Sequence, residues 1–127
     1  AELLEKVVQN TQAGIVLFEP VRDQAGAVAD FRYLLTNDVN SAVTGRTRRE
    51  MEGNGMLELF PSTRDTGLFE HMRRVVESGQ SVRYEQHYQG DGLDNWLDML
   101  FTPLDNGLLF TYLDITDRRR AELAVQQ

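Results

Sequence analysis

Three aspartates lie close together around a glycine-rich segment, and carboxylates at such spacing could bind a metal ion or serve as acid and base. Asp91 stands between the two glycines of segment 90–92, and Asp94 and Asp98 follow it. Aspartate is also common in turns, because its side chain bonds to the nearby backbone and it tolerates a left-handed conformation. We therefore predict a turn here, and we expect no metal site.

Histidine and cysteine supply much of the other chemistry of protein sites, and this chain has two histidines and no cysteine. The absence of cysteine excludes disulfides, cysteine-bound zinc, iron–sulfur clusters and a thiol nucleophile. His71 lies beside the apolar stripe of a predicted helix, where we expect a partly exposed side chain. His87 lies on the polar side of a predicted strand, where we expect it to be solvated.

A third group of residues lies near the C-terminal end of the sequence. Asp114 and Thr116 stand at the end of a predicted strand, and Arg118 and Arg119 follow them. Threonine at this place caps the next helix, a contribution of about 0.5–2 kcal/mol. We also expect Asp114 to pair with one of the two arginines. The group predicts a rigid joint, through which a change in the sheet would tilt or rotate the final helix.

The composition limits the partners of the chain. Its 127 residues suit one domain, and its net charge of −7 at pH 7 repels nucleic-acid phosphates, so we expect no nucleic-acid partner. The longest apolar run, Ile15–Phe18, is far shorter than the ~20 residues of a membrane span, so we expect no membrane contact. Residues 1–6 do not resemble a secretory signal. We expect the chain to be one part of a longer protein.

The apolar periodicity predicts two strands, a set of short helices, and three more strands. The strands are expected at residues 15–18, 31–36, 80–89, 95–104 and 108–115, and the longest central helix at 65–78. Thr47 and Glu50 form a capping box that begins a short helix before it. Residues 1–12 predict an amphipathic helix, and 117–127 the start of another.

The last two predicted strands are apolar on both faces, which means that both faces of the sheet are covered. The short helices can cover one face. The N-terminal helix or a second copy of the protein must cover the other, so we expect a homodimer. Its predicted interface consists of Leu3, Leu4, Val7, Val8 and Trp96.

This order of elements resembles the PAS domain, a five-stranded antiparallel sheet of the α+β class with short helices on one face and flanking N- and C-terminal helices. Most specific is the segment 114–122, which is similar to the Asp-Ile-Thr tail that joins PAS sensors to a signalling helix. The remaining matches are Asn37-Asp38-Val39, Val43-Thr44-Gly45, the helix 47–53, Leu59-Phe60-Pro61, the helix end 75–79, and Thr102-Pro103-Leu104 with Gly107.

The resemblance implies a cytoplasmic sensory and dimerisation module of bacterial signal transduction, not itself an enzyme. It implies a PAS domain over 13–116 and a C-terminal output domain in the parent chain, such as a histidine kinase or a cyclic-dinucleotide enzyme. Family members that bond flavin or a thioester chromophore need a cysteine, so both are excluded. Haem-binding members use a histidine where this chain has Gly67, with His71 one turn later, so we do not expect haem.

The predicted pocket lies between the sheet and the long helix and would hold a small, mostly apolar ligand with a few polar contacts. Aromatic and methionine side chains at these spacings also fill ordinary cores. Two alternatives stay open: a ligand-free interaction module, and a small isomerase-like enzyme that uses a carboxylate and a tyrosine. The pocket candidates are Tyr33, Leu35, Met56, Phe60, Met72, Tyr84, Met99, Phe101 and Tyr112.

Overall fold

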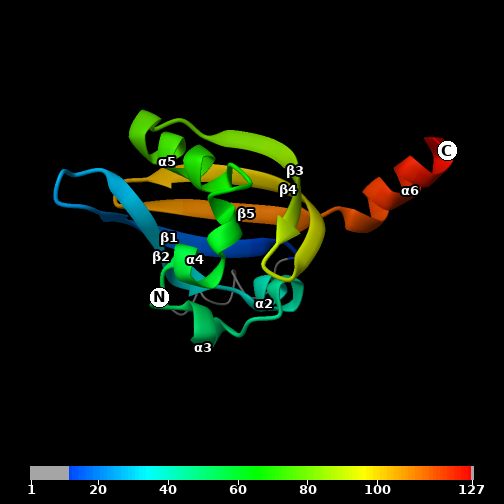
Figure 1. Ribbon diagram of the computed structural model, residues 1–127, viewed down its shortest axis with the longest axis horizontal. Helices are drawn as coiled ribbons and strands as arrows, with labels where there is room; N and C mark the ends of the chain where they lie inside the picture. The colour runs from blue at the N-terminus through cyan, green and yellow to red at the C-terminus, as the bar shows by residue number, and fades with distance from the viewer. Residues whose placement is uncertain (1–11, 127) are drawn as a thin grey trace.

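The computed structural model describes residues 12–126, which form an antiparallel sheet with helices packed on one face (Figure 1). The five strands lie in the order β2-β1-β5-β4-β3, and the predicted α+β fold is confirmed. The predicted N-terminal helix, with Leu3, Leu4, Val7 and Val8, lies outside the described residues. In chain order the elements are β1 (Gly14–Arg22), β2 (Val28–Thr36), α2 (Asp38–Thr44), α3 (Arg48–Met51), α4 (Met56–Leu59), η1 (Pro61–Thr63), α5 (Leu68–Ser78), β3 (Val82–Gly90), β4 (Leu93–Leu104), β5 (Gly107–Asp114) and α6 (Thr116–Gln126).

The first two strands form a hairpin whose turn is closed by Asp23. Its carboxylate accepts hydrogen bonds from two backbone N–H groups of the turn. The sequence predicted that β1 ends before Pro20, but the strand continues to Arg22. Beyond Phe18, β1 pairs with β2 only. The strand is therefore an edge at Pro20, and an edge tolerates a residue that lacks a backbone N–H group.

A β-bulge at Leu34 reverses the direction in which the end of β2 presents its side chains. Leu17 pairs with Leu35 and Phe18 pairs with Tyr33, so no residue of β1 lies opposite Leu34. Tyr33 is buried on the face that the helices cover, here called the inner face. Leu35, which pairs with Leu17, lies on the opposite face, here called the outer face, and is half-buried.

Two of the short helices, α2 and α3, begin at residues whose side chains cap them. The predicted capping box is confirmed, because the N–H of Glu50 donates to Thr47 Oγ1 at 3.1 Å and the N–H of Thr47 donates to Glu50 Oε1 at 3.0 Å. Helix α5 starts later than expected, at Leu68. Gly67 before it has a φ of 84°, a left-handed conformation that favours glycine and interrupts a helix.

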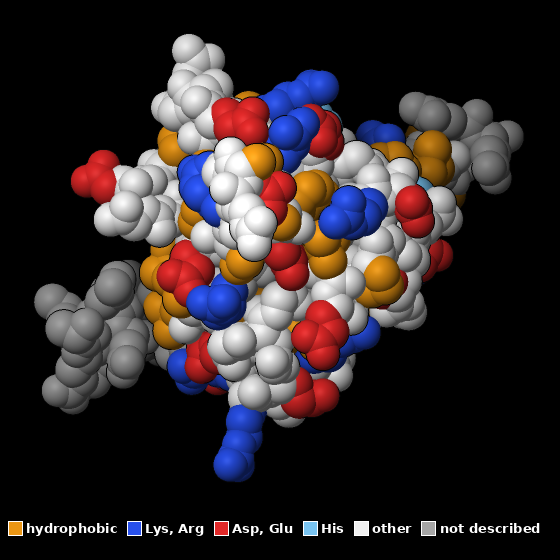
Figure 2. All heavy atoms as spheres, turned by 60° about the vertical axis from the view of Figure 1, so that its left-hand side comes forward, with side chains coloured by type: hydrophobic (Ala, Val, Ile, Leu, Met, Phe, Trp, Pro, Cys, Tyr) orange, Lys and Arg blue, Asp and Glu red, His pale blue; other side chains and the backbone are white. Residues whose placement is uncertain are grey.

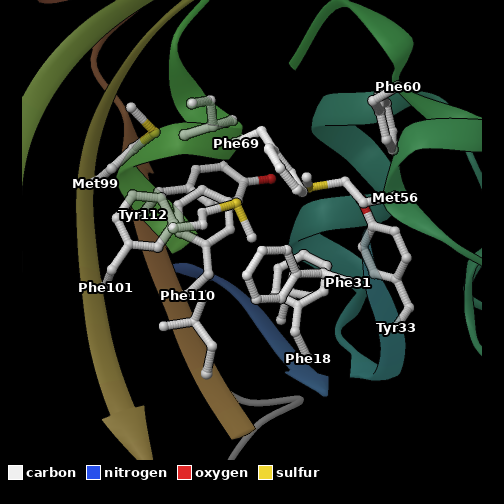
Figure 3. Close-up of a cluster of buried hydrophobic side chains, with 14 of the residues drawn as sticks. Phe18, Phe31, Tyr33, Met56, Phe60, Phe69, Met99, Phe101, Phe110 and Tyr112 are labelled. Atoms are coloured by element: carbon white, nitrogen blue, oxygen red, sulfur yellow. The ribbon is translucent and has the colours of Figure 1, made fainter. Parts of the chain in front are cut away.

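The hydrophobic core lies between the inner face of the sheet and the helices (Figure 3). Helix α5 contributes Met72 and Val75, which are almost completely buried. The sheet contributes stacked aromatic rings, with the centres of Phe101 and Phe110 separated by 4.7 Å. Burial of each side chain of this size contributes about 1.5–3 kcal/mol to the free energy of unfolding. This core fixes the helices over the sheet.

The outer face of the sheet is apolar in part, as the sequence predicted. Leu100 and Leu113 lie on it and are 38% and 48% exposed. On the face of the molecule drawn in Figure 2, acidic and basic side chains are interspersed, and no basic patch is visible there. Helix α6 leaves the sheet at one end and projects away from it (Figure 1).

Candidate functional site

A cavity lies between the inner face of the sheet and the short helices. It offers about 60 Å³ to water-sized molecules, which is room for several waters or a small ligand. Five of the predicted pocket residues line it, namely Tyr33, Met56, Phe60, Met72 and Tyr112. The other lining residues are Val16, Phe18, Asn40, Val43, Thr44, Thr63, Leu68, Tyr88, Leu93, Asn95, Leu97 and Phe110.

The other predicted pocket residues lie elsewhere. Met99 and Phe101 are fully buried in the core beside the cavity. Tyr84 is half-buried, and the centre of its ring lies 4.4 Å from that of His71 in α5. Leu35 is on the outer face because of the bulge in β2. The alternation of residues along a strand does not show which inner-face residues border the cavity. It reveals neither bulges nor how deeply a side chain lies in the core.

The asparagines and threonines of the cavity were not predicted from the sequence. Asn40 is 3% exposed, and its Oδ1 accepts a hydrogen bond of 2.5 Å from the hydroxyl of Tyr112. Its Nδ2 donates to Thr36 Oγ1 at 2.8 Å. Thr44 lies one turn further along α2 and donates to the carbonyl of Asn40. The available signal was an asparagine in the middle of a short helix, a position that asparagine does not favour.

All four tyrosines of the chain are held in the neutral form by their surroundings. Burial raises the pKa of Tyr33 well above its ordinary value, and the neighbouring Tyr112 and Tyr88 raise it further. Burial likewise raises the pKa of Tyr84, Tyr88 and Tyr112. The phenol groups around the cavity therefore act as hydrogen-bond donors at neutral pH.

Alkaline titration should reveal these tyrosines only as the protein unfolds. The folded pKa of each phenol exceeds its unfolded value of about 10, so the stability it contributes is complete below that pH and is lost as the pH rises above it. We expect tyrosinate absorbance and the loss of circular dichroism to rise in one cooperative step. A gradual tyrosinate signal near pH 10 in a folded protein would contradict the burial of these side chains.

The turn between β3 and β4 closes one side of the cavity. The hydroxyl of Tyr88 donates to Asp91 Oδ2 at 2.6 Å, and the backbone N–H and the hydroxyl of Ser62 donate to the same carboxylate. Asp91 has a φ of 56°, as the turn prediction allows for aspartate. Asp94 contacts His87 at 2.5 Å, and Asp98 pairs with Arg83 at 2.8 Å. Each of the three aspartates thus has a protein partner of its own.

The predicted joint residues Asp114 and Thr116 lie in direct contact at the junction of β5 and α6. Asp114 Oδ1 accepts hydrogen bonds from the backbone N–H and from the hydroxyl of Thr116. The Thr116 hydroxyl also accepts the backbone N–H of Trp96 at 3.0 Å. The hydroxyl therefore accepts a backbone N–H group of β4, as a neighbouring strand would. The sequence had predicted that it would cap α6. This hydroxyl group is one of the contacts that attach the first turn of α6 to the sheet.

The two arginines of the joint have partners other than the predicted Asp114. Arg118 pairs with Glu85 on β3 at 3.0 Å. The guanidinium carbon of Arg119 lies 4.3 Å from the centre of the Trp96 ring. The sequence could not reveal these partners, because β3 and β4 come next to α6 only through the pairing of the sheet.

Trp96, a predicted dimer residue, is itself part of the joint. The ring of His87 stacks on it with a centre-to-centre distance of 4.5 Å and an angle of 16° between the planes. His87 is half-buried in this stack, whereas the sequence predicted a solvated side chain. Trp96 is thus held between His87 and Arg119.

Asn95 connects the cavity with the joint. It lies on the inner face of β4 and is one of the residues that line the cavity. Its Nδ2 donates a hydrogen bond of 3.1 Å to Asp114 Oδ2. Among residues 12–126, no aspartate or glutamate lines the cavity. The arrangement therefore places hydrogen-bonding groups on the cavity wall and a direct contact between that wall and the start of α6.

Comparison with known proteins gives structural relatives and one family. The likeness is to an RNA-binding light-oxygen-voltage receptor (TM-score 0.71, 17% identity, 99% of this chain and 35% of that one). It extends to a domain of a sensory box sensor histidine kinase/response regulator from Geobacter sulfurreducens (TM-score 0.65, 17% identity, 89% and 92%). It also includes the PAS domain of the Cronobacter turicensis RpfR quorum-sensing receptor in complex with BDSF (TM-score 0.64, 16% identity, 86% and 99%).

At these identities the likeness shows the fold alone, and the chain spans about a third of the length of the light-oxygen-voltage receptor. No curated protein sequence matches the chain. None of the helices between residues 12 and 126 has both the length and the apolar character needed to cross a membrane. The model of the PAS fold matches residues 20–120, which is most of the sequence. The chain therefore belongs to the PAS fold family.

Proposed function

We infer that the chain is a sensory module of a bacterial signalling protein, in which the state of the cavity determines the position of α6. The observation that carries this proposal is the double role of Asn95, which borders the cavity and bonds to Asp114. A molecule that bonds to the Asn95 amide competes with the carboxylate of Asp114. The module itself performs no reaction and shifts an equilibrium between two positions of the helix.

A second connection supports the same route. Tyr112 borders the cavity on β5, in the same strand as Asp114. Its hydroxyl bonds to Asn40, so a ligand that takes this bond also acts on the strand that ends at the joint. Differential contacts of this kind are what a ligand needs to shift a conformational equilibrium.

The setting of the module is part of the proposal. We place the module in the cytoplasm, before a C-terminal output domain. The likeness to a domain of a sensor histidine kinase/response regulator supports a signalling setting, and the receptor domain in complex with BDSF supports a bound small molecule. The exposed Leu100 and Leu113 support a homodimer through the outer face of the sheet. Trp96 would stand at the end of that interface.

Native mass spectrometry and the fluorescence of Trp96, the one tryptophan of the chain, test this proposal. We expect the freshly purified protein to carry a bound mass and to be dimeric. Unfolding in urea, dialysis and refolding should remove that mass and shift the Trp96 emission. An absorbance scan then shows whether the bound molecule is coloured.

Substitution of two asparagines separates ligand binding from the effect of the ligand on α6. Asn95→Ala should bind the molecule more weakly, because one hydrogen bond is lost, and saturating amounts of it should no longer change the Trp96 emission. Asn106 is exposed in the turn between β4 and β5, and Asn106→Ala should behave as the unchanged protein. A protein with no bound mass and no emission change would contradict the sensory proposal and favour a ligand-free interaction module.

A further inference from the structure

His87 of β3 and two arginines of α6 contact the same two groups of β4. The imidazole of His87 stacks on the Trp96 ring, and its Nε2 lies 2.5 Å from Asp94 Oδ1. The guanidinium carbon of Arg119 lies 4.3 Å from the centre of the same ring. Arg120 Nη2 lies 4.0 Å from the other oxygen of the Asp94 carboxylate. One indole ring and one carboxylate are therefore shared between a histidine and the helix.

Other charged side chains of β3, β4 and α6 pair with one another. Asp94 is therefore the carboxylate that the structure places against the imidazole of His87. At the end of β5, Asp114 bonds to Asn95 and Thr116. The ion pairs are those of Arg83 with Asp98 at 2.8 Å, Arg118 with Glu85 at 3.0 Å, and Arg119 with Glu122 at 3.2 Å.

A change in the charge of His87 alters both of the shared groups. Histidine is the side chain that ordinarily gains or loses its charge between pH 5 and 8. A neutral imidazole leaves the charge of Asp94 to Arg120 and the face of the indole to the guanidinium of Arg119. A protonated imidazole forms an ion pair with Asp94 and adds a second cation to the ring, which repels the guanidinium.

The two arginine contacts are weak enough for one charge to matter. The side chains of Asp94 and Arg120 are 60% and 64% exposed, and ion pairs at such exposure contribute little to stability. A cation on the face of an exposed aromatic ring is also a contact of modest strength. The charge of His87 can therefore change the fraction of molecules in which this part of α6 lies against β4.

We propose that the joint is a proton-sensitive switch, in which protonation of His87 releases Arg119 and Arg120 of α6 from β4. At neutral and alkaline pH the two arginines hold the helix against the sheet, and acid pH shifts the population toward the released helix. This inference goes beyond the sensory role of the cavity. His87 is not among the residues that border the cavity and its side chain is 31% exposed, so protons reach it directly from the solvent.

The fluorescence of Trp96 tests the first step, because this single tryptophan of the chain contacts His87 directly. The protein is freed of any bound mass by unfolding and refolding and is then titrated from pH 8 to pH 5, the range in which histidine changes its charge. We expect one change in emission, because a protonated imidazole quenches an excited indole more strongly than a neutral one. His87→Gln keeps a polar side chain that carries no charge and should abolish the change. His71, the other histidine, is half-buried on α5, and His71→Gln is the matched control that should retain the change.

A distance measurement between two spin labels tests the second step. The chain has no cysteine, so Asn106→Cys in the turn after β4 and Ala124→Cys on α6 supply two exposed label sites. We expect a narrow distribution of label distances at pH 8 and a broader one at pH 5. In His87→Gln the distribution should stay narrow at both pH values. The double substitution Arg119→Gln and Arg120→Gln should give the broad distribution already at pH 8.

Three results would overturn the proposal. The first is an emission that stays constant from pH 8 to pH 5 or that still changes in His87→Gln. The second is a distance distribution that is the same at both pH values. The third is a narrow distribution in the double arginine variant, because the arginines would then not hold the helix. Since both measurements use protein without a bound molecule, their outcome does not depend on whether the cavity acts as a sensor.

Discussion

Replacing Thr116 with valine is expected to lower the free energy of unfolding by about 2–3 kcal/mol. Valine has nearly the shape of threonine but lacks the hydroxyl. That hydroxyl donates to Asp114 and accepts the N–H of Trp96 at 3.0 Å. Without it, the Trp96 N–H loses its partner in a site where Thr116 is 8% exposed. Urea unfolding followed by circular dichroism measures the change.

The same substitution should release α6 from the sheet. Hydrogen exchange of the Trp96 amide and of the first turn of α6 should become faster, because the bond that joins them is lost. Thr116→Ser keeps the hydroxyl and removes one methyl group, so it should cost only about 1 kcal/mol and leave the exchange slow. Equal losses in the valine and serine variants would show that the hydroxyl does not hold the joint.

Replacing Gly14 with alanine is expected to lower the free energy of unfolding by about 3 kcal/mol. Gly14 pairs with Tyr112 across β1 and β5, and a Cβ at Gly14 would overlap the Tyr112 ring. The ring must then move and give up its hydrogen bond to Asn40. Thermal and urea unfolding measure the loss of stability. The fluorescence of Trp96 shows whether the movement of the Tyr112 ring also changes the structure at the joint.

A double-mutant cycle with Tyr112→Leu identifies the cause of that loss. Leucine removes the ring and its hydroxyl, so the added cost of Gly14→Ala in this background should fall below about 1 kcal/mol. The two residues would then be energetically coupled, as their contact implies. An unchanged cost of about 3 kcal/mol in the leucine background would assign the effect to the backbone of β1 instead.

The sequence determined the fold and the ends of several elements, because these depend on signals within a few residues. The capping box of Thr47 and Glu50 and the glycine that ends α5 act inside a single turn. The period of two along β3 indicated which of its side chains face the core. The segment from Asp114 to Thr116 marked the joint, since its residues contact one another directly.

Only the tertiary structure decided which residues meet in the cavity and at the joint. The bulge at Leu34 places Leu35 on the outer face of the sheet, away from the cavity, although the sequence shows only alternation there. The bond between Asn95 and Asp114 joins residues 19 positions apart, and the bond between Tyr112 and Asn40 joins residues 72 positions apart. Such pairs depend on strand order and register, which no local pattern encodes. The identity of the chemical groups was therefore readable in the sequence, whereas their assembly required the folded sheet.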